Sequence, residues 1–277
     1  IAHGFAGSRQ LMLPYAQTLA RAGYTAVRFD FAGHGRSGSA LTGSITDPDG
    51  ATRTLVDETK KVVAHARGLG DGRLAILGHS MASDIIIRTA IEAPDIAATV
   101  AISMFSPAVT ESEPRNLLVI VGDLETQLKD EALRVVGLVA NAAAEPGRIY
   151  GDLAQGTARR AVFAPHVEHV GVLYAEAGLT AAVEWLDGTF GVARPAPVTP
   201  ASGGLAILTL LLGVVLIARP LSRFLPEVST APAGAGLAWR RLVFVILVPM
   251  VATPLLLTVV PTHFLPVLVG DYLAVHF

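Results

Sequence analysis

The sequence changes character near residue 200, and this change constrains the fold more than any other feature. Of its 44 charged side chains, 38 lie in residues 1–200 and only 6 in residues 201–277. Two stretches of the C-terminal part, about 201–218 and 242–260, contain no charge. At about 1.5 Å rise per residue, a helix of this length is just able to cross a bilayer core of roughly 30 Å. We expect a globular domain followed by a membrane region.

A proline-rich segment separates the two parts. Residues 194–204 contain three prolines, which cannot continue a helix. We therefore predict a globular domain over 1–192, a linker over 193–204 and a membrane region over 205–277, in which a third span could begin at residue 261. The prolines of the second span, Pro249 and Pro254, are tolerated in membrane helices whose neighbours satisfy the freed carbonyl groups. A buried soluble hairpin is the alternative, but neither stretch has the polar stripe that it would show.

Charge at the chain's C-terminal half also suggests an orientation. The loop between the two stretches has four arginines against Glu227, and short positive loops tend to stay in the cytoplasm. A multi-pass protein of a plasma or bacterial inner membrane, with the globular domain outside, follows as an expectation. The sequence starts at Ile1 without a signal-peptide pattern, and we expect its natural start, with the first strands of the sheet, to lie upstream.

Apolar runs alternate with amphipathic stretches through the globular part. Short strands are predicted at about 1–4, 24–31, 74–77, 97–104, 117–121 and 160–164, and helices at about 8–22, 49–67, 127–144 and 171–187. This alternation is typical of a mostly parallel sheet covered by helices on both faces, which is the α/β class.

Composition excludes several functions. The net charge is −2 and no tract is rich in Lys or Arg, so we expect no nucleic-acid partner. The absence of cysteine excludes a disulfide framework, a thiolate metal site and a cysteine nucleophile. Nothing in the sequence calls for a cofactor.

Ser80 stands at a predicted strand-to-helix corner, in Gly78-His79-Ser80-Met81-Ala82. Small residues on either side allow a strained turn that lifts the hydroxyl above the sheet, at the N-terminus of the next helix. This placement suits a nucleophile. A simple helix cap would explain the serine but not the preceding glycine and buried strand.

The motif resembles the nucleophile elbow G-x-S-x-G of the α/β-hydrolase family, with Ala82 in place of the last glycine. Two further segments are similar to that family: residues 2–8, which look like its oxyanion loop, and residues 28–37. The resemblance covers about residues 1–190. It implies that the backbone N–H groups of Phe5 and Met81 form the oxyanion hole, and that an acid and a histidine follow Ser80 in that order.

A serine hydroxyl is a poor nucleophile by itself, so a histidine base is required. The resemblance implies that this histidine follows Ser80 in the chain. His263 and His276 lie in the presumed membrane region, which leaves His166 and His169. The resemblance favours His169, which precedes the family's last helix. The two could instead form a metal pair, but helical ligand pairs usually need a four-residue spacing and a third ligand, so no metal is expected.

The acid is expected in Gly122-Asp123-Leu124-Glu125, because the predicted strand before this segment resembles the family's seventh strand. The resemblance favours Glu125, three residues after the glycine, with Asp123 as the alternative or as a helix cap. For His79, contact with the substrate pocket and packing beside the nucleophile both remain open.

The stretch from Phe105 to Asn116 is too short for a helical lid, so the chain resembles the lidless dienelactone-hydrolase-like and serine-aminopeptidase-like members. We expect a serine hydrolase that cleaves a small-molecule or lipid-like carboxylic ester through an acyl-enzyme. Amide or peptide cleavage and acyl transfer use the same residues, and a non-catalytic module attached to a membrane is the alternative from a different class.

Overall fold

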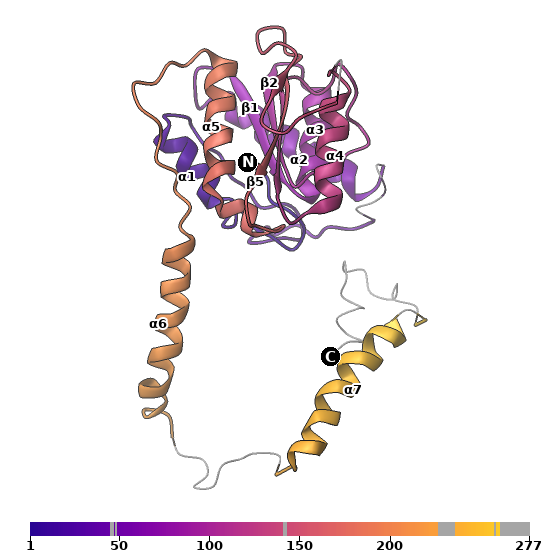
Figure 1. Ribbon diagram of the computed structural model, residues 1–277, viewed down its shortest axis with the longest axis vertical. Coiled ribbons are helices and arrows are strands. Elements are labelled where there is room, and N and C mark those ends of the chain that lie inside the picture. The colour runs from indigo at the N-terminus through magenta and orange to yellow at the C-terminus, as the bar shows by residue number, and fades with distance from the viewer. Residues whose placement is uncertain (45–46, 48, 141–142, 227–235, 258, 261–277) are drawn as a thin grey trace.

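The computed structural model (Figure 1) describes residues 1–44, 47, 49–140, 143–226, 236–257 and 259–260. Its helices are α1 (Leu13–Arg21), α2 (Ala51–Ala66), α3 (Met81–Glu92), α4 (Thr126–Gly137), α5 (Glu176–Phe190), α6 (Gly204–Ser222) and α7 (Trp239–Leu257), with the 3-10 turn η1 (Gly171–Tyr174) before α5. Its strands are β1 (Leu74–His79), β2 (Ile96–Ile102), β3 (Leu117–Gly122), β4 (Ile149–Tyr150) and β5 (Arg159–Ala164).

The strands form one sheet in the order β1-β2-β3-β5-β4. Every pairing is parallel except that of the short β4 with β5, which is antiparallel. Parallel neighbours require a crossover connection between them. Helix α3 makes this connection from β1 to β2, and α4 lies in the connection from β3 to β5. The expected α/β class with a mostly parallel sheet is confirmed.

Alternate side chains of each strand point to opposite layers. Leu118 and Ile120 of β3 pack into a core with α1 and α5, whereas Leu117, Val119 and Val121 pack into a core with α4. A third core joins α2 and α3 to the β1 side of that second face. Figure 1 shows α1 and α5 on one side of the sheet and α2, α3 and α4 on the other. Both faces are covered, which explains why the strands read as continuous apolar runs.

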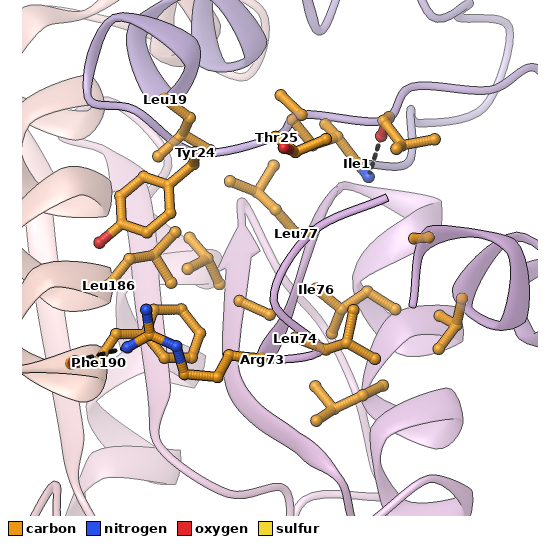
Figure 2. Close-up of a pocket in the computed structure, with 18 of the residues that line it drawn as sticks. Ile1, Leu19, Tyr24, Thr25, Arg73, Leu74, Ile76, Leu77, Leu186 and Phe190 are labelled. Carbon is orange, nitrogen blue, oxygen red and sulfur yellow. Dashed lines mark hydrogen bonds between the residues drawn. The ribbon is translucent and has the colours of Figure 1, made fainter. Parts of the chain in front are cut away.

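The first thirty residues differ from expectation. The strands predicted at 1–4 and 24–31 are absent as ladders: Ala2 makes one isolated parallel bridge with Gly78, and residues 24–30 have no regular structure. A cavity of about 460 Å³ lies between residues 24–29 and β1 (Figure 2). With this cavity between them, residues 24–29 and β1 do not pair in the part of the chain that the structure describes. The short β4 was also not anticipated.

The two apolar stretches form α6 and α7, each 19 residues long, with mean hydropathies of 2.2 and 1.9. None of the side chains in these two helices is buried. Both are long and apolar enough to span a membrane. The possible third span from residue 261 falls outside the described residues.

Candidate active site

The turn between β1 and α3 holds Ser80 in a strained conformation. Its φ of 55° and ψ of −120° lie outside the regions that L-residues favour. The turn is closely packed, since a side chain at Gly4 would come within 2.9 Å of the Ser80 Cβ. At Gly78, an added Cβ would lie 2.9 Å from the Ala82 carbonyl oxygen. Gly4 therefore lets its loop approach Ser80, and Gly78 lets the end of β1 pack closely against the start of α3.

Three side chains from three strand ends form one hydrogen-bonded chain. His169 Nε2 lies 2.8 Å from Ser80 Oγ, and His169 Nδ1 lies 2.5 Å from Glu125 Oε1. Ser80 follows β1, Glu125 follows β3 and His169 follows β5, so all three stand at the carboxyl edge of the sheet. With Nδ1–H donating to the carboxylate, Nε2 is free to accept the serine proton.

Glu125 is held on its far side as well. Its Oε2 accepts hydrogen bonds from the Gly122 N–H and the Ser103 hydroxyl, both at 2.7 Å. Burial alone would raise the pKa of this carboxyl, but the hydrogen bonds from His169, Ser103 and Gly122 outweigh it and lower the pKa. Glu125 is therefore ionised at neutral pH and in one orientation.

The loop that carries His169 is held by hydrogen bonds with neighbouring residues. The Glu168 carboxylate accepts the backbone N–H groups of Val170 and Gly171 at 2.8 and 2.7 Å. His79 Nε2 lies 2.8 Å from the His169 carbonyl oxygen, and the two rings are 4.8 Å apart. A carbonyl only accepts, so His79 must carry its proton on Nε2. Burial lowers the pKa of His79 to about 4, which keeps this ring neutral.

The two residues expected to supply the oxyanion hole flank Ser80. Met81 is the first residue of α3, where backbone N–H groups have no partner within the helix. Phe5 follows Gly4, the residue that packs against Ser80. His3 supports this loop: its Nε2 accepts from the Phe31 N–H at 3.2 Å, so its Nδ1–H donates to the Gly4 carbonyl at 2.8 Å.

Asp123 and His166, the alternative acid and base, lie outside the hydrogen-bonded chain of Ser80, His169 and Glu125. Asp123 is half exposed, with Lys129 Nζ at 3.6 Å and the His166 backbone N–H at 3.4 Å. His166 has a φ of 60° and an exposed side chain. Both ring nitrogens of His169 face Ser80 and Glu125, so His166 and His169 do not converge on a shared metal position.

The candidate site is open to solvent, and it is separate from the cavity beside β1. About 44% of the His169 side chain is exposed, and the connection from β2 to β3 spans only residues 103–116. The cavity of Figure 2 lies beside β1 and residues 24–29, and none of Ser80, Glu125 and His169 lines it. Ser80 faces the carboxyl edge of the sheet, and no helical lid covers this edge in the described residues.

A parallel sheet between helical layers, with a serine on a strained turn after a strand, defines the α/β-hydrolase fold. The chain belongs to the serine aminopeptidase S33 family of hydrolases, whose model matches residues 1–144. The crystal structure of TT1662 from Thermus thermophilus resembles it with a TM-score of 0.46 and 16% identity, covering 70% of this chain and 88% of that one. A search of curated proteins finds no match.

Two contacts of the site were not predicted from the sequence. Ser103, which directly follows β2 and has a φ of 48°, donates to Glu125, and His79 donates to the backbone of His169. A serine directly after a buried strand is a signal that it stands at the carboxyl edge. Its partner, however, is 22 residues away in the chain, so only the fold reveals the pairing.

Proposed function

We propose that this hydrolase is a membrane-anchored serine hydrolase that cleaves carboxylic esters through an acyl-enzyme. The observation that carries the proposal is the hydrogen-bonded chain from Ser80 Oγ through His169 to Glu125. Ser80 serves as the nucleophile, His169 as the base and Glu125 as the acid that orients the base. The two apolar helices α6 and α7 support the anchor.

In the proposed reaction, Ser80 Oγ attacks the ester carbonyl carbon while His169 Nε2 takes its proton. The negative charge on the carbonyl oxygen meets the N–H groups of Phe5 and Met81, an interaction worth about 3–4 kcal/mol per donor where it has been measured. The intermediate then releases the alcohol, which receives the proton from His169. Water activated by the same histidine attacks the acyl-enzyme and frees the acid and Ser80.

Amide or peptide cleavage is the second candidate, which the family description favours. An aminopeptidase must bind the ammonium group of its substrate, for which a free carboxylate is suited. Three carboxylates in the loops after β3 and β5 have other partners: Glu125 binds His169, Glu168 binds two backbone N–H groups, and Asp123 meets Lys129. This arrangement supports an uncharged acyl group.

Paired substrates test this choice. An ester and an amide should be offered to the full chain, and kcat/KM measured for each. The two substrates share the acyl group and the aromatic ring of the leaving group, which is an alcohol in the ester and an amine in the amide. We expect the ester to be hydrolysed and the amide to react far more slowly. Faster hydrolysis of an amide with a free amino terminus would replace the proposal by a peptidase. Transfer of the acyl group to an added alcohol in preference to water would replace it by an acyltransferase.

The pH dependence follows from the Glu125 hydrogen bond. That bond raises the pKa of His169 above its usual 6.5, and only neutral His169 can accept the serine proton. We therefore expect kcat/KM to rise with pH through a midpoint above 6.5 and then level off. In Glu125→Gln the bond to a negative charge is lost, so the midpoint should move to lower pH. Profiles of residual activity for both proteins check this, and an unmoved midpoint would contradict the assigned partner.

His79 is predicted to position the base through its bond to the His169 carbonyl. His79→Leu leaves that carbonyl without its donor, and a lost hydrogen bond of this kind corresponds to a decrease of about 10-fold or more in kcat. His79→Gln keeps an N–H donor at a similar reach and should recover most of kcat, with little change in KM for either variant. Equal losses in both variants, at equal melting temperatures, would show that the imidazole acts by packing alone.

A further inference from the structure

Four large apolar side chains stand exposed around the candidate active site. Phe5, Phe105, Leu124 and Val170 have exposed fractions of 37, 66, 63 and 48%. Each lies within two residues of a group in the site: Phe5 of Gly4, Phe105 of Ser103, Leu124 of Glu125, and Val170 of His169. We call these four residues the apolar rim.

The rim lies on one edge of the sheet. Phe105 follows β2, Leu124 follows β3 and Val170 follows β5, while Phe5 follows the bridge of Ala2 with Gly78. The carboxyl ends of parallel strands meet at one edge, so the rim lies on the same edge of the sheet as Ser80. Exposed apolar side chains gathered at one place mark a surface that contacts another apolar body.

The linker indicates which apolar body lies close to the rim. Its last residues are bound to the domain, because the Ala201 N–H donates to Thr18 Oγ1 at 2.9 Å and Arg21 donates to the Thr199 carbonyl at 3.3 Å. Val198 packs against the core formed by α1 and α5. Only a few residues therefore separate the last bond between linker and domain from the start of α6. From that point α6 runs away from the domain (Figure 1).

The start of α6 lies beside the loop that carries the base. A Cβ added at Gly204, the first residue of α6, would lie 3.9 Å from the Tyr174 Cβ. Tyr174 ends η1, which begins at Gly171, directly after the rim residue Val170. The point where the chain enters the apolar helix is thus on the same edge as the opening to Ser80.

We propose that the apolar rim rests on the membrane that α6 enters, so that Ser80 receives its substrate from the bilayer. The substrate is then an amphiphilic ester whose apolar acyl chain moves from the lipid into the open site. This proposal rests on the proposed ester hydrolysis and on α6 spanning the membrane. The bound linker limits how far the domain can turn, and the absence of a lid in the described residues leaves the rim as the surface that the acyl chain crosses.

Because the chain contains no cysteine, single thiols can report the orientation directly. We would label Phe105→Cys and Leu124→Cys with an environment-sensitive fluorophore and reconstitute the full chain in phosphatidylcholine vesicles containing a doxyl-labelled lipid. Leu69→Cys is the matched control, since Leu69 is 47% exposed but precedes β1 and so lies at the opposite edge of the sheet. We expect both rim labels to shift to the blue and lose most of their emission, with Leu69 unchanged. Rim labels quenched no more than the Leu69 label would overturn the proposal.

Activity supplies the second measurement. Phe105→Ser with Leu124→Ser should lower kcat/KM for a long-chain ester held in the vesicles by about 10-fold or more, because two apolar contacts with the bilayer are removed. Hydrolysis of a water-soluble short-chain ester should stay close to that of the unmodified protein, as in Leu69→Ser. Equal losses on both esters, or none on the long-chain ester, would refute the membrane route. If the unmodified protein hydrolyses neither ester, the proposed function fails, and the quenching result still decides the orientation separately.

Discussion

Ser80→Ala should remove fluorophosphonate labelling of the protein and lower kcat for ester hydrolysis by about 10⁴-fold or more. The reagent reacts quickly only with an activated serine, and the activation comes from the bond between Ser80 Oγ and His169 Nε2. His169→Ala should lose labelling as well, since the hydroxyl then has no base. The labelled amount and kcat are to be measured on the same preparations.

Ser112→Ala is the matched control for this prediction, because Ser112 is an exposed serine in the short connection from β2 to β3. It should label and turn over like the unmodified protein. Melting temperatures close to that of the unmodified protein would show that Ser80→Ala and His169→Ala remain folded. Labelling that persists in Ser80→Ala would place the reactive group elsewhere. A folded protein that takes no label would support the non-catalytic module.

Glu125→Gln should lower kcat by about 10⁴-fold, the size of the loss when the orienting carboxylate of a Ser-His-Asp triad is replaced by its amide. The geometry gives the reason. The Gly122 N–H points at the position of Oε2 and requires an acceptor there, so the amide oxygen of a glutamine takes that position. Its NH₂ group then faces His169 Nδ1, which favours the tautomer with the proton on Nε2. That tautomer cannot take the proton of Ser80.

Asp123→Asn is the comparison for Glu125→Gln. Asp123 meets Lys129 and the backbone of His166 at the surface, and a surface ion pair contributes little. We expect kcat within a few-fold of the unmodified protein. The reverse pattern, a large loss in Asp123→Asn and a small one in Glu125→Gln, would assign the orienting acid to Asp123.

Much of the domain was predictable because its signals are local. The buried strands β1, β2, β3 and β5 read as short apolar runs, since parallel strands covered on both faces need apolar side chains on both. The glycines around Ser80 mark a turn that only small residues permit. The two uncharged stretches of the C-terminal part announce α6 and α7.

Pairing between distant segments was harder to foresee. Residues 24–31 have the composition of a strand, but a strand forms only against a partner, and a cavity separates this segment from β1. In the same way, nothing near Ser103 in the sequence indicates that its hydroxyl meets Glu125.

The sequence by itself determined the α/β class, the elbow at Ser80, the family and the two apolar helices, because each depends on residue types within a short window. Only the tertiary structure decided which carboxylate faces His169, which group holds the histidine loop, and that the bound linker starts α6 beside Tyr174. These are contacts between the ends of different elements, and their geometry depends on how the sheet orders its strands. That order is a property of the whole packed domain and is not written in any one segment.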